Sequence, residues 1–255
     1  METNKYLNIN RLYYLIRRDL VINYKSFLIG IAAVGGFLLL LLLGDTYVRG
    51  FLSYEPVVVT FYLFFFAGGF IFTSKVFNEL NREDSGYRYL TLPASTLEKL
   101  ISKWLLSSVV FIIVSYIGIQ LVVLLGALIS MALFDAEFHV INFAKADFLM
   151  EAARYLVVHS IFFLGACAFR NHNFLKTLLA IFVVGAVVSA FTIAVGYLLP
   201  GKTVIVEPDY LSSLESLNYS NFLSAIDQIT EIVKWYVVAP FFLIVSYFKL
   251  TERQV

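Results

Sequence analysis

The chain has 255 residues and a formal net charge of +1, and 60% of its residues are hydrophobic while only 15% are charged. Soluble domains rarely have such a composition, so the chain is predicted to be an integral membrane protein. The small net charge says little about partners, because in a membrane protein the distribution of charge between loops matters more. We expect no nucleic-acid partner.

Six apolar blocks, each close to the length of a bilayer crossing, have no Asp, Glu, Lys or Arg in their interiors. A spanning helix needs roughly 20 mostly apolar residues, because every backbone amide must be bonded within the segment where no water is available. The blocks run from Ser26 to Leu43, Val57 to Ser74, Leu105 to Leu133, Tyr155 to Phe169, Leu175 to Leu199 and Ile229 to Phe248. We therefore predict an all-α polytopic membrane protein with six transmembrane helices.

This layout leaves no room for a soluble domain of ordinary size. We predict a cytoplasmic amphipathic helix in residues 1–25, a six-helix domain in 26–248 and a cytoplasmic tail in 249–255. Any energy-supplying domain is then a separate polypeptide. The single cysteine, Cys167, lies in the fourth block and is predicted to be a small packing residue.

Basic residues indicate the orientation. If loops alternate between the two sides, residues 1–25, the loops 75–103 and 170–176 and the tail share one side, and they hold 14 of the 19 Lys and Arg residues. Retained Lys and Arg mark the cytoplasmic face, so both termini are predicted to be cytoplasmic.

Two loops on the other side are long. The 134–154 loop mixes acidic and apolar residues, which favours a short helix at the membrane surface. The 200–228 loop begins with Pro200 and Gly201, a pair that ends helices, and a new amphipathic helix is predicted from Asn221.

The cytoplasmic loop 75–103 is the most charged of the inner loops. The second helix is predicted to continue through Glu79 to Asp84, and the chain should turn at Pro93, because proline disfavours helix at the residue before it. Ser95 followed by Glu98 is a capping box, which predicts that the third helix begins there. Such a loop is either a solvated turn or, given its tyrosine-rich segment, a surface for a protein partner.

The string Leu92, Pro93, Ala94, Ser95, followed by Glu98 and Lys103 and preceded by Glu79 and Gly86, resembles the permease subunits of type-2 ABC exporters. The six-span layout, the basic segment before the first span and the long outer loop before the last are also similar to that family.

The resemblance implies that the 79–98 region is a coupling helix that docks on a separate ATPase, with two permease copies, a homodimer, in the active unit. ATP and Mg would then be bound by the partner ATPase and no cofactor or metal by this chain, which has no Gly-x-x-x-x-Gly-Lys-Ser/Thr phosphate loop. The residues implied in coupling are Glu79, Arg82, Glu83, Tyr87, Leu92, Pro93, Ser95, Glu98 and Lys103.

The segment from Asn8 to Tyr24 places Leu12, Leu15, Ile16 and Leu20 on one side and Arg11, Arg17 and Arg18 on the others. It can lie along the inner interface with its basic side toward anionic headgroups, or it can simply lead into the first span. The resemblance implies that it also touches the ATPase.

The spans offer few polar groups. Gln120 is expected to bond another helix or face a cavity, and His159, placed near the outer end of the fourth block, is expected to be a hydrogen-bonded structural residue. Aromatic residues of the second block, with Phe61, Tyr62 and Phe65 among them, face lipid or line a path for an amphipathic substrate, a path to which Gln120 would also belong.

An enzyme is not expected, because the three histidines lie on separate segments and no His-Glu-x-x-His or Gly-x-Ser-x-Gly string occurs. The hypothesis is a multi-pass permease subunit of an ATP-driven exporter in the inner membrane of a bacterium. The alternative is a noncatalytic membrane scaffold or sensor that uses the same loop to bind a cytoplasmic partner.

Overall fold

The structure is a computed structural model, and it describes residues 7–81, 86, 87, 89, 91–134, 146–198 and 233–253. Within these residues every regular element is a helix. The elements are α1 (Ile9–Arg49), α2 (Glu55–Lys75), the 3₁₀-helix η1 (Asn78–Asn81), α4 (Thr96–Leu105), the π-helix η2 (Leu106–Val110), α5 (Phe111–Phe134), α6 (Ala146–Ala168), α7 (Asn173–Leu198), the π-helix η4 (Val233–Val237) and α10 (Val238–Glu252).

Five helical segments in the described residues are long and apolar enough to cross a membrane: Ile9–Arg49, Glu55–Leu80, Thr96–Phe134, Phe148–Ala168 and Asn173–Ala194. They correspond to the first five predicted spans and confirm an all-helical, membrane-type architecture. The sixth predicted span, 229–248, coincides in part with η4 and α10 and begins outside the described residues. The count of six therefore stays a prediction.

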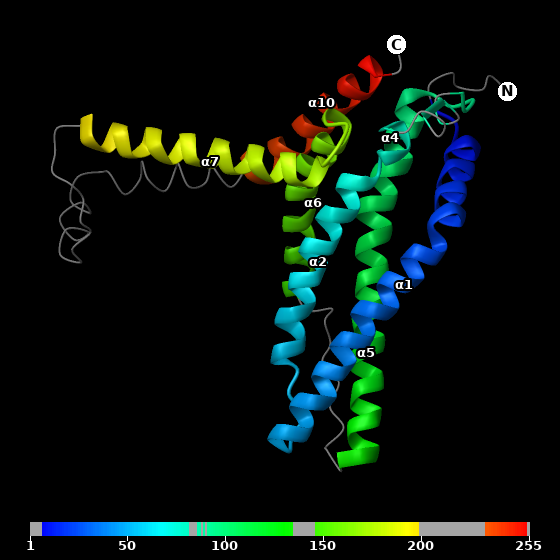
Figure 1. The fold of residues 1–255 in the computed structure, drawn as a ribbon, viewed down its shortest axis with the longest axis vertical. Helices are drawn as coiled ribbons and strands as arrows, with labels where there is room; N and C mark the ends of the chain where they lie inside the picture. The colour runs from blue at the N-terminus through cyan, green and yellow to red at the C-terminus, as the bar shows by residue number, and fades with distance from the viewer. Residues whose placement is uncertain are drawn as a thin grey trace.

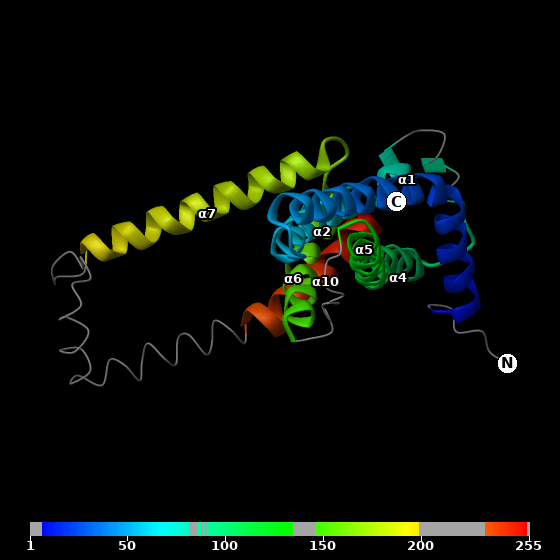
Figure 2. The same ribbon diagram turned by 90° about the horizontal axis from the view of Figure 1, so that it is seen from below.

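Helices α1, α2, α5 and α6 form a bundle, and α10 crosses one end of it (Figure 1). The first residues of α1 and the last residues of α10 lie at this same end, which we call the termini end. Figure 2 shows that the amino-terminal part of α1 turns away from the direction of the rest of that helix. The predicted amphipathic segment and the first span are thus one bent helix.

Local signals explain where several helices begin and end. Asn8 caps α1 by accepting a hydrogen bond from the Asn10 amide, and Gly50 ends it with φ of 75°, a conformation that glycine adopts without steric cost. Pro56 lies in the first turn of α2, where its missing N–H has no helical partner to lose. The predicted capping box of Ser95 and Glu98 is present at the start of α4.

Two apolar clusters hold the bundle together. The larger one joins α1, α2, α5 and α6; its buried members are Leu38, Leu42, Tyr54, Val57, Phe61, Phe65, Ile119, Val122, Val123, Phe148, Ala152 and Tyr155. The smaller one lies toward the termini end and contains Val76, Phe77, Leu100, Phe163, Ala166, Cys167 and Leu250. Cys167 is fully buried there, which confirms its predicted role as a packing residue.

Two predicted helix boundaries were wrong. The second helix does not continue as an α-helix through Glu79. It ends at Lys75, where the Val76 amide bonds the Thr73 carbonyl three residues back, and the 3₁₀-helix η1 follows. The fourth helix begins at Ala146 and not at Tyr155, and it accommodates the charged Glu151 and Arg154 as an ion pair along one helix face. The predicted surface helix of loop 134–154, as far as it concerns residues 135–145, and the predictions for residues 200–228 lie outside the described residues.

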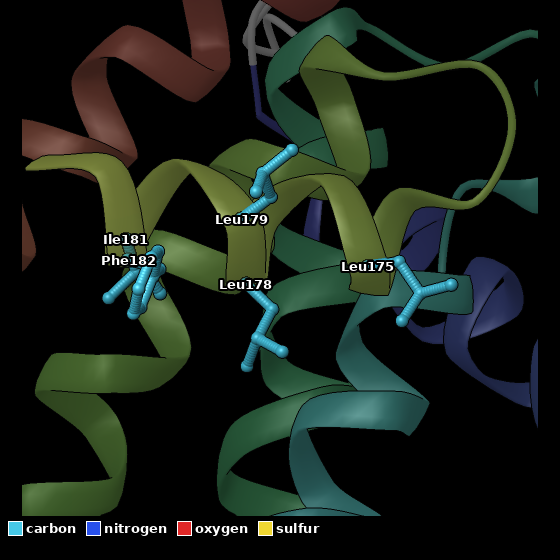
Figure 3. Close-up of a pocket in the computed structure, with 5 residues that line it drawn as sticks. All are labelled: Leu175, Leu178, Leu179, Ile181 and Phe182. Carbon is cyan, nitrogen blue, oxygen red and sulfur yellow. The ribbon is translucent and has the colours of Figure 1, made fainter.

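Helix α7 leaves the bundle at the termini end and extends to one side, across the direction of the other helices (Figures 1 and 2). From Asn173 to Ala194 its side chains are almost all exposed. The depression in Figure 3 is lined by Leu175, Leu178, Leu179, Ile181 and Phe182, all from α7. A hollow made by one helix is the surface of that helix and not a ligand cleft, which needs walls from several elements.

Candidate functional site

The segments singled out by the sequence meet at the termini end of the bundle. The amino-terminal part of α1 packs against α4, and η1 lies beside both through its Glu79 side chain. A small number of charged groups join α1 to the 75–103 loop, although the two are far apart in the sequence. We call the set Arg11, Arg18, Asp19, Glu79, Tyr89, Glu98, Lys99 and Lys103 the charged cluster.

Glu98 ties the start of α1 to the start of α4. Its carboxylate is fully buried and accepts hydrogen bonds from the backbone amides of Asn8, at 2.7 Å, and of Ser95, at 2.9 Å. Arg11 donates to the same carboxylate through Nε at 3.1 Å and lies 2.9 Å from it through Nη2. One side chain therefore caps α4 and anchors the amino-terminal turn of α1, which is how a buried carboxylate is stabilised.

Two turns further along α1, Asp19 forms the most enclosed ion pair in the described residues. Its Oδ2 lies 2.9 Å from Nζ of Lys103, and the side chains are only 2% and 5% exposed. Arg18 bonds Asp19 at 3.2 Å and Glu79 at 3.0 Å, and Glu79 lies 3.9 Å from Lys103. Two cations and two carboxylates thus alternate across α1, η1 and α4.

Burial raises the pKa of Asp19, and the neighbouring Lys103 ammonium opposes that effect. Asp19 lies in the part of α1 that precedes the predicted membrane span. Since the pKa remains raised, attraction by the two cations does not fully offset the cost of removing the carboxylate from water. Buried ion pairs of this kind generally add little net stability, while the loss of one partner is costly.

The ring of Tyr89 lies close to three cationic side chains of the charged cluster. The Nζ atoms of Lys99 and Lys103 are each 5.4 Å from its ring centroid, and the Arg18 guanidinium is 5.8 Å from it. Burial raises the pKa of the Tyr89 hydroxyl well above its usual range, so the ring stays neutral and offers its face to the positive charges. Tyr89 thus anchors the loop from within the charged cluster.

The predicted coupling residues divide into a buried and an exposed group. Glu98 and Lys103 are buried in the charged cluster, and Glu79 contributes to it. Tyr87 and Pro93 are exposed, while Leu92 and Ser95 are half-buried at the turn before α4. Arg82 and Glu83 lie outside the described residues.

The three basic residues of the amphipathic segment do not share one environment. Arg11 and Arg18 face the protein and pair with carboxylates, whereas Arg17 is exposed. Leu15 is buried, Leu12 and Ile16 are half-buried and Leu20 is exposed, so the predicted apolar stripe lies only partly against the protein.

Sequence reasoning missed Asp19, Tyr89 and Lys99. The signal for Asp19 was a carboxylate beside Arg17 and Arg18 in a segment whose other charges are almost all positive. No comparable signal marks Tyr89, because Tyr87 precedes it by two residues and only the fold shows that one ring is buried and the other exposed.

A second polar group lies inside the bundle. Ser107 Oγ and His159 Nε2 share a hydrogen bond of 2.8 Å, and the Tyr155 hydroxyl donates to the Ser107 carbonyl at 2.8 Å. His159 was predicted near the outer end of its span; because α6 begins at Ala146, it lies near the middle of the helix. Its predicted role as a hydrogen-bonded structural residue is confirmed.

This serine and histidine do not by themselves form a hydrolytic site. Both are fully buried, and Nδ1 of His159, which a third residue orients in a catalytic triad, has no partner among the described residues. A substrate would need access to the Ser107 hydroxyl, but Ser107 is fully buried, and the His159 ring is packed against the rings of Tyr155 and Phe163.

The predicted path residues do not share one surface: two are buried in the bundle and two are half-buried. Phe61 and Phe65 are in the interior of the bundle, where Phe65 contacts Phe111, Phe148 and Tyr155, so they do not face lipid. Tyr62 is half-buried. Gln120 donates to the Tyr116 hydroxyl of its own helix at 3.4 Å and lines an open hollow on the surface of α5; of the two expected alternatives, a bond to another helix is not seen within the described residues.

Three comparisons with known proteins were made. No protein-family model matches the chain, and no curated protein or solved structure gives a significant match.

Proposed function

We propose that this chain is the membrane-spanning permease subunit of an ATP-driven exporter, and that a separate cytoplasmic ATPase drives it through the charged cluster. The observation that carries the proposal is the convergence of α1, η1 and α4 on alternating charges at one end of a membrane-type bundle, with the central Asp19–Lys103 pair almost removed from solvent. The motif resemblance supplies the function class.

The geometry supports a mechanical role for this end of the bundle. The Glu98 and Asp19–Lys103 contacts lie two helical turns apart on α1, so they fix both the position and the direction of that helix relative to α4. A force applied to the loop is then transmitted to two membrane helices at once. A loop that served only to connect two spans would not need buried charges from a distant segment.

The exposed residues beside the charged cluster form the proposed docking surface. Tyr87 is 73% exposed although the neighbouring Tyr89 is buried, and Pro93 is exposed at the turn before α4. Interfaces favour tyrosine because it provides a large contact area with few rotatable bonds. In this proposal the termini end faces the cytoplasm of a bacterium, as the distribution of basic residues indicates.

The partners follow from this assignment. The ATPase would bind ATP and Mg, and a second copy of this chain would complete the permease. ATP binding would close the ATPases, and the spans would open outward. Spans without charged residues in their apolar interiors favour an amphipathic cargo.

The test is co-expression with an ATPase that carries the phosphate loop and is encoded next to this chain. We expect a stable complex that hydrolyses ATP in lipid nanodiscs, and loss of that complex for Glu79→Arg or Pro93→Gly. Tyr47→Ala, which changes an exposed residue at the far end of α1, is the control. If no such ATPase is encoded nearby, or if both variants keep complex formation and ATP-dependent transport, the assignment is wrong and a scaffold or sensor is favoured.

A further inference from the structure

One segment of the long third helix departs from α-helical geometry. Residues Leu106–Val110 form the π-helix η2 between α4 and α5, and Leu106, Ser107 and Ser108 are buried within it. A π-helical segment pairs each amide with the carbonyl five residues back, which costs stability and marks a place where a helix changes register or bends. Some contact must therefore compensate for this geometry.

The compensating contacts come from α6. Tyr155 and His159 are one turn apart on that helix and share a face, and both reach Ser107. Tyr155 donates to its carbonyl oxygen, and His159 bonds its hydroxyl. A single residue of η2 is thus held at its backbone and at its side chain by a neighbouring helix.

Tyr155 is itself fixed by packing. Its ring stacks on Phe70 with a centroid distance of 5.6 Å and an interplanar angle of 7°. A Cβ atom at Gly69 would lie 2.5 Å from the ring, so the close approach of α2 depends on that glycine. The ring has little freedom to leave Ser107.

The same serine leads to the charged cluster. Ser107 Oγ donates to the Lys103 carbonyl at 2.9 Å, and the Lys103 ammonium pairs with Asp19. A continuous path of polar contacts therefore runs from α1 through the end of α4 to the middle of α6.

We propose that η2 is a hinge between α4 and α5, that Tyr155 and His159 hold it in its π-helical state, and that its release changes the direction of α4 relative to α5. Helices have few ways to bend sharply, and a change between π- and α-helical pairing is one that needs no unfolding. The role of this hinge in transport rests on the proposed function; its existence does not.

The first experiment uses the chain alone in lipid nanodiscs. Spin labels are placed at Thr91→Cys, before α4, and at Ile117→Cys, on the exposed side of α5, in a Cys167→Ala background, and their distance distribution is measured by pulsed electron paramagnetic resonance. We expect one narrow population for the parent chain. Ser107→Ala, Tyr155→Phe and His159→Phe should each add a second population.

Ser130→Ala is the matched control, because Ser130 is an equally buried serine on α5 whose hydroxyl has no partner among the described residues. It should leave the distance distribution unchanged. Tyr155→Phe removes a single oxygen and keeps the ring, so it decides the question if either of the other variants does not fold. If Tyr155→Phe and Ser107→Ala both give the distance distribution of the parent chain, the hinge proposal is wrong.

The second experiment adds the ATPase of the proposed complex. ATP with vanadate should shift the label distance in the parent complex, and this shift should be lost in Tyr155→Phe while ATP hydrolysis continues. If no ATPase binds the parent chain, the proposed function fails and the first experiment still decides the hinge. If the ATPase binds and Tyr155→Phe shifts as the parent does, the hinge has no part in coupling.

Discussion

Lys103 of α4 and Asp19 of α1 form an ion pair of 2.9 Å in which both side chains are almost completely removed from solvent. The pair joins a segment that precedes the first predicted span to a segment that precedes the third. Buried ion pairs contribute little net stability, but the loss of one partner leaves an unpaired charge. This asymmetry gives the first prediction.

Lys103→Met should destabilise the protein by about 3 kcal/mol, because Asp19 would stay buried without its closest cation. The double variant Asp19→Leu with Lys103→Met should recover most of that loss, since apolar residues of similar size need no desolvation. Thermal unfolding in detergent, followed by intrinsic fluorescence, measures both. A double variant no more stable than Lys103→Met would show that the unpaired carboxylate is not the cause.

Glu98→Gln should loosen the start of α1 more than the start of α4. Glutamine can still cap α4, but its amide has one acceptor oxygen for the donors from Asn8, Arg11 and Ser95. Hydrogen exchange should therefore rise most in the amides of residues 9–13. Ser95→Ala, which removes only the cap and costs about 1 kcal/mol, should affect α4 first. Equal protection patterns in the two variants would contradict this division.

Gly69→Ala should lower the stability of the protein, whereas Gly68→Ala should raise it. A Cβ at Gly69 would lie 2.5 Å from the Tyr155 ring and 2.8 Å from the Phe111 ring, whereas one at Gly68 would meet nothing within 4 Å. Overpacking costs about 1–3 kcal/mol, and replacing a helical glycine by alanine gains up to about 1 kcal/mol. Melting temperatures of the two variants in detergent test the contrast. A Gly69→Ala protein as stable as the Gly68→Ala protein would refute the close packing of α2 on α6.

Tyr87→Ala should leave the fold intact and weaken the proposed ATPase contact. The Tyr87 side chain is 73% exposed, so its removal should change the free energy of unfolding by less than about 0.5 kcal/mol. The affinity of the chain in nanodiscs for the ATPase should fall at least about tenfold if Tyr87 is an interface anchor. Tyr47→Ala, an equally exposed tyrosine at the far end of α1, is the control. Unchanged affinity for Tyr87→Ala would place the docking surface elsewhere.

The apolar blocks and the Ser95–Glu98 capping box could be read from the sequence because both depend on neighbouring residues. Hydrocarbon requires long runs without charge, and a capping box needs only a serine and a glutamate three residues apart. The start of α6 could not be read in this way. The charged residues Glu151 and Arg154 were placed in a loop before the span, but in α6 they pair three residues apart on one face, so the helix begins before them.

Only part of the charged cluster could be predicted, because its remaining members depend on contacts between distant segments. Glu79, Glu98 and Lys103 were marked by the motif, but their partners Asp19 and Tyr89 depend on how α1 packs against the loop. The π-helix η2 had no sequence signal at all. Its contacts come from Tyr155 and His159 on another helix, and a serine pair within an apolar run does not indicate the pairing of its backbone.

The acidic partners of Arg11 and Arg18 fix an order of events during synthesis. Glu79 and Glu98 are synthesised after the first span, so when the insertion machinery reads the nascent chain Arg11 lacks its carboxylate partner and Arg18 has only the adjacent Asp19. In the proposed orientation, their positive charge would favour retention of the leading segment on the side of translation. After the third helix has been made, the same arginines would pair with Glu79 and Glu98 and hold α1 against η1 and α4.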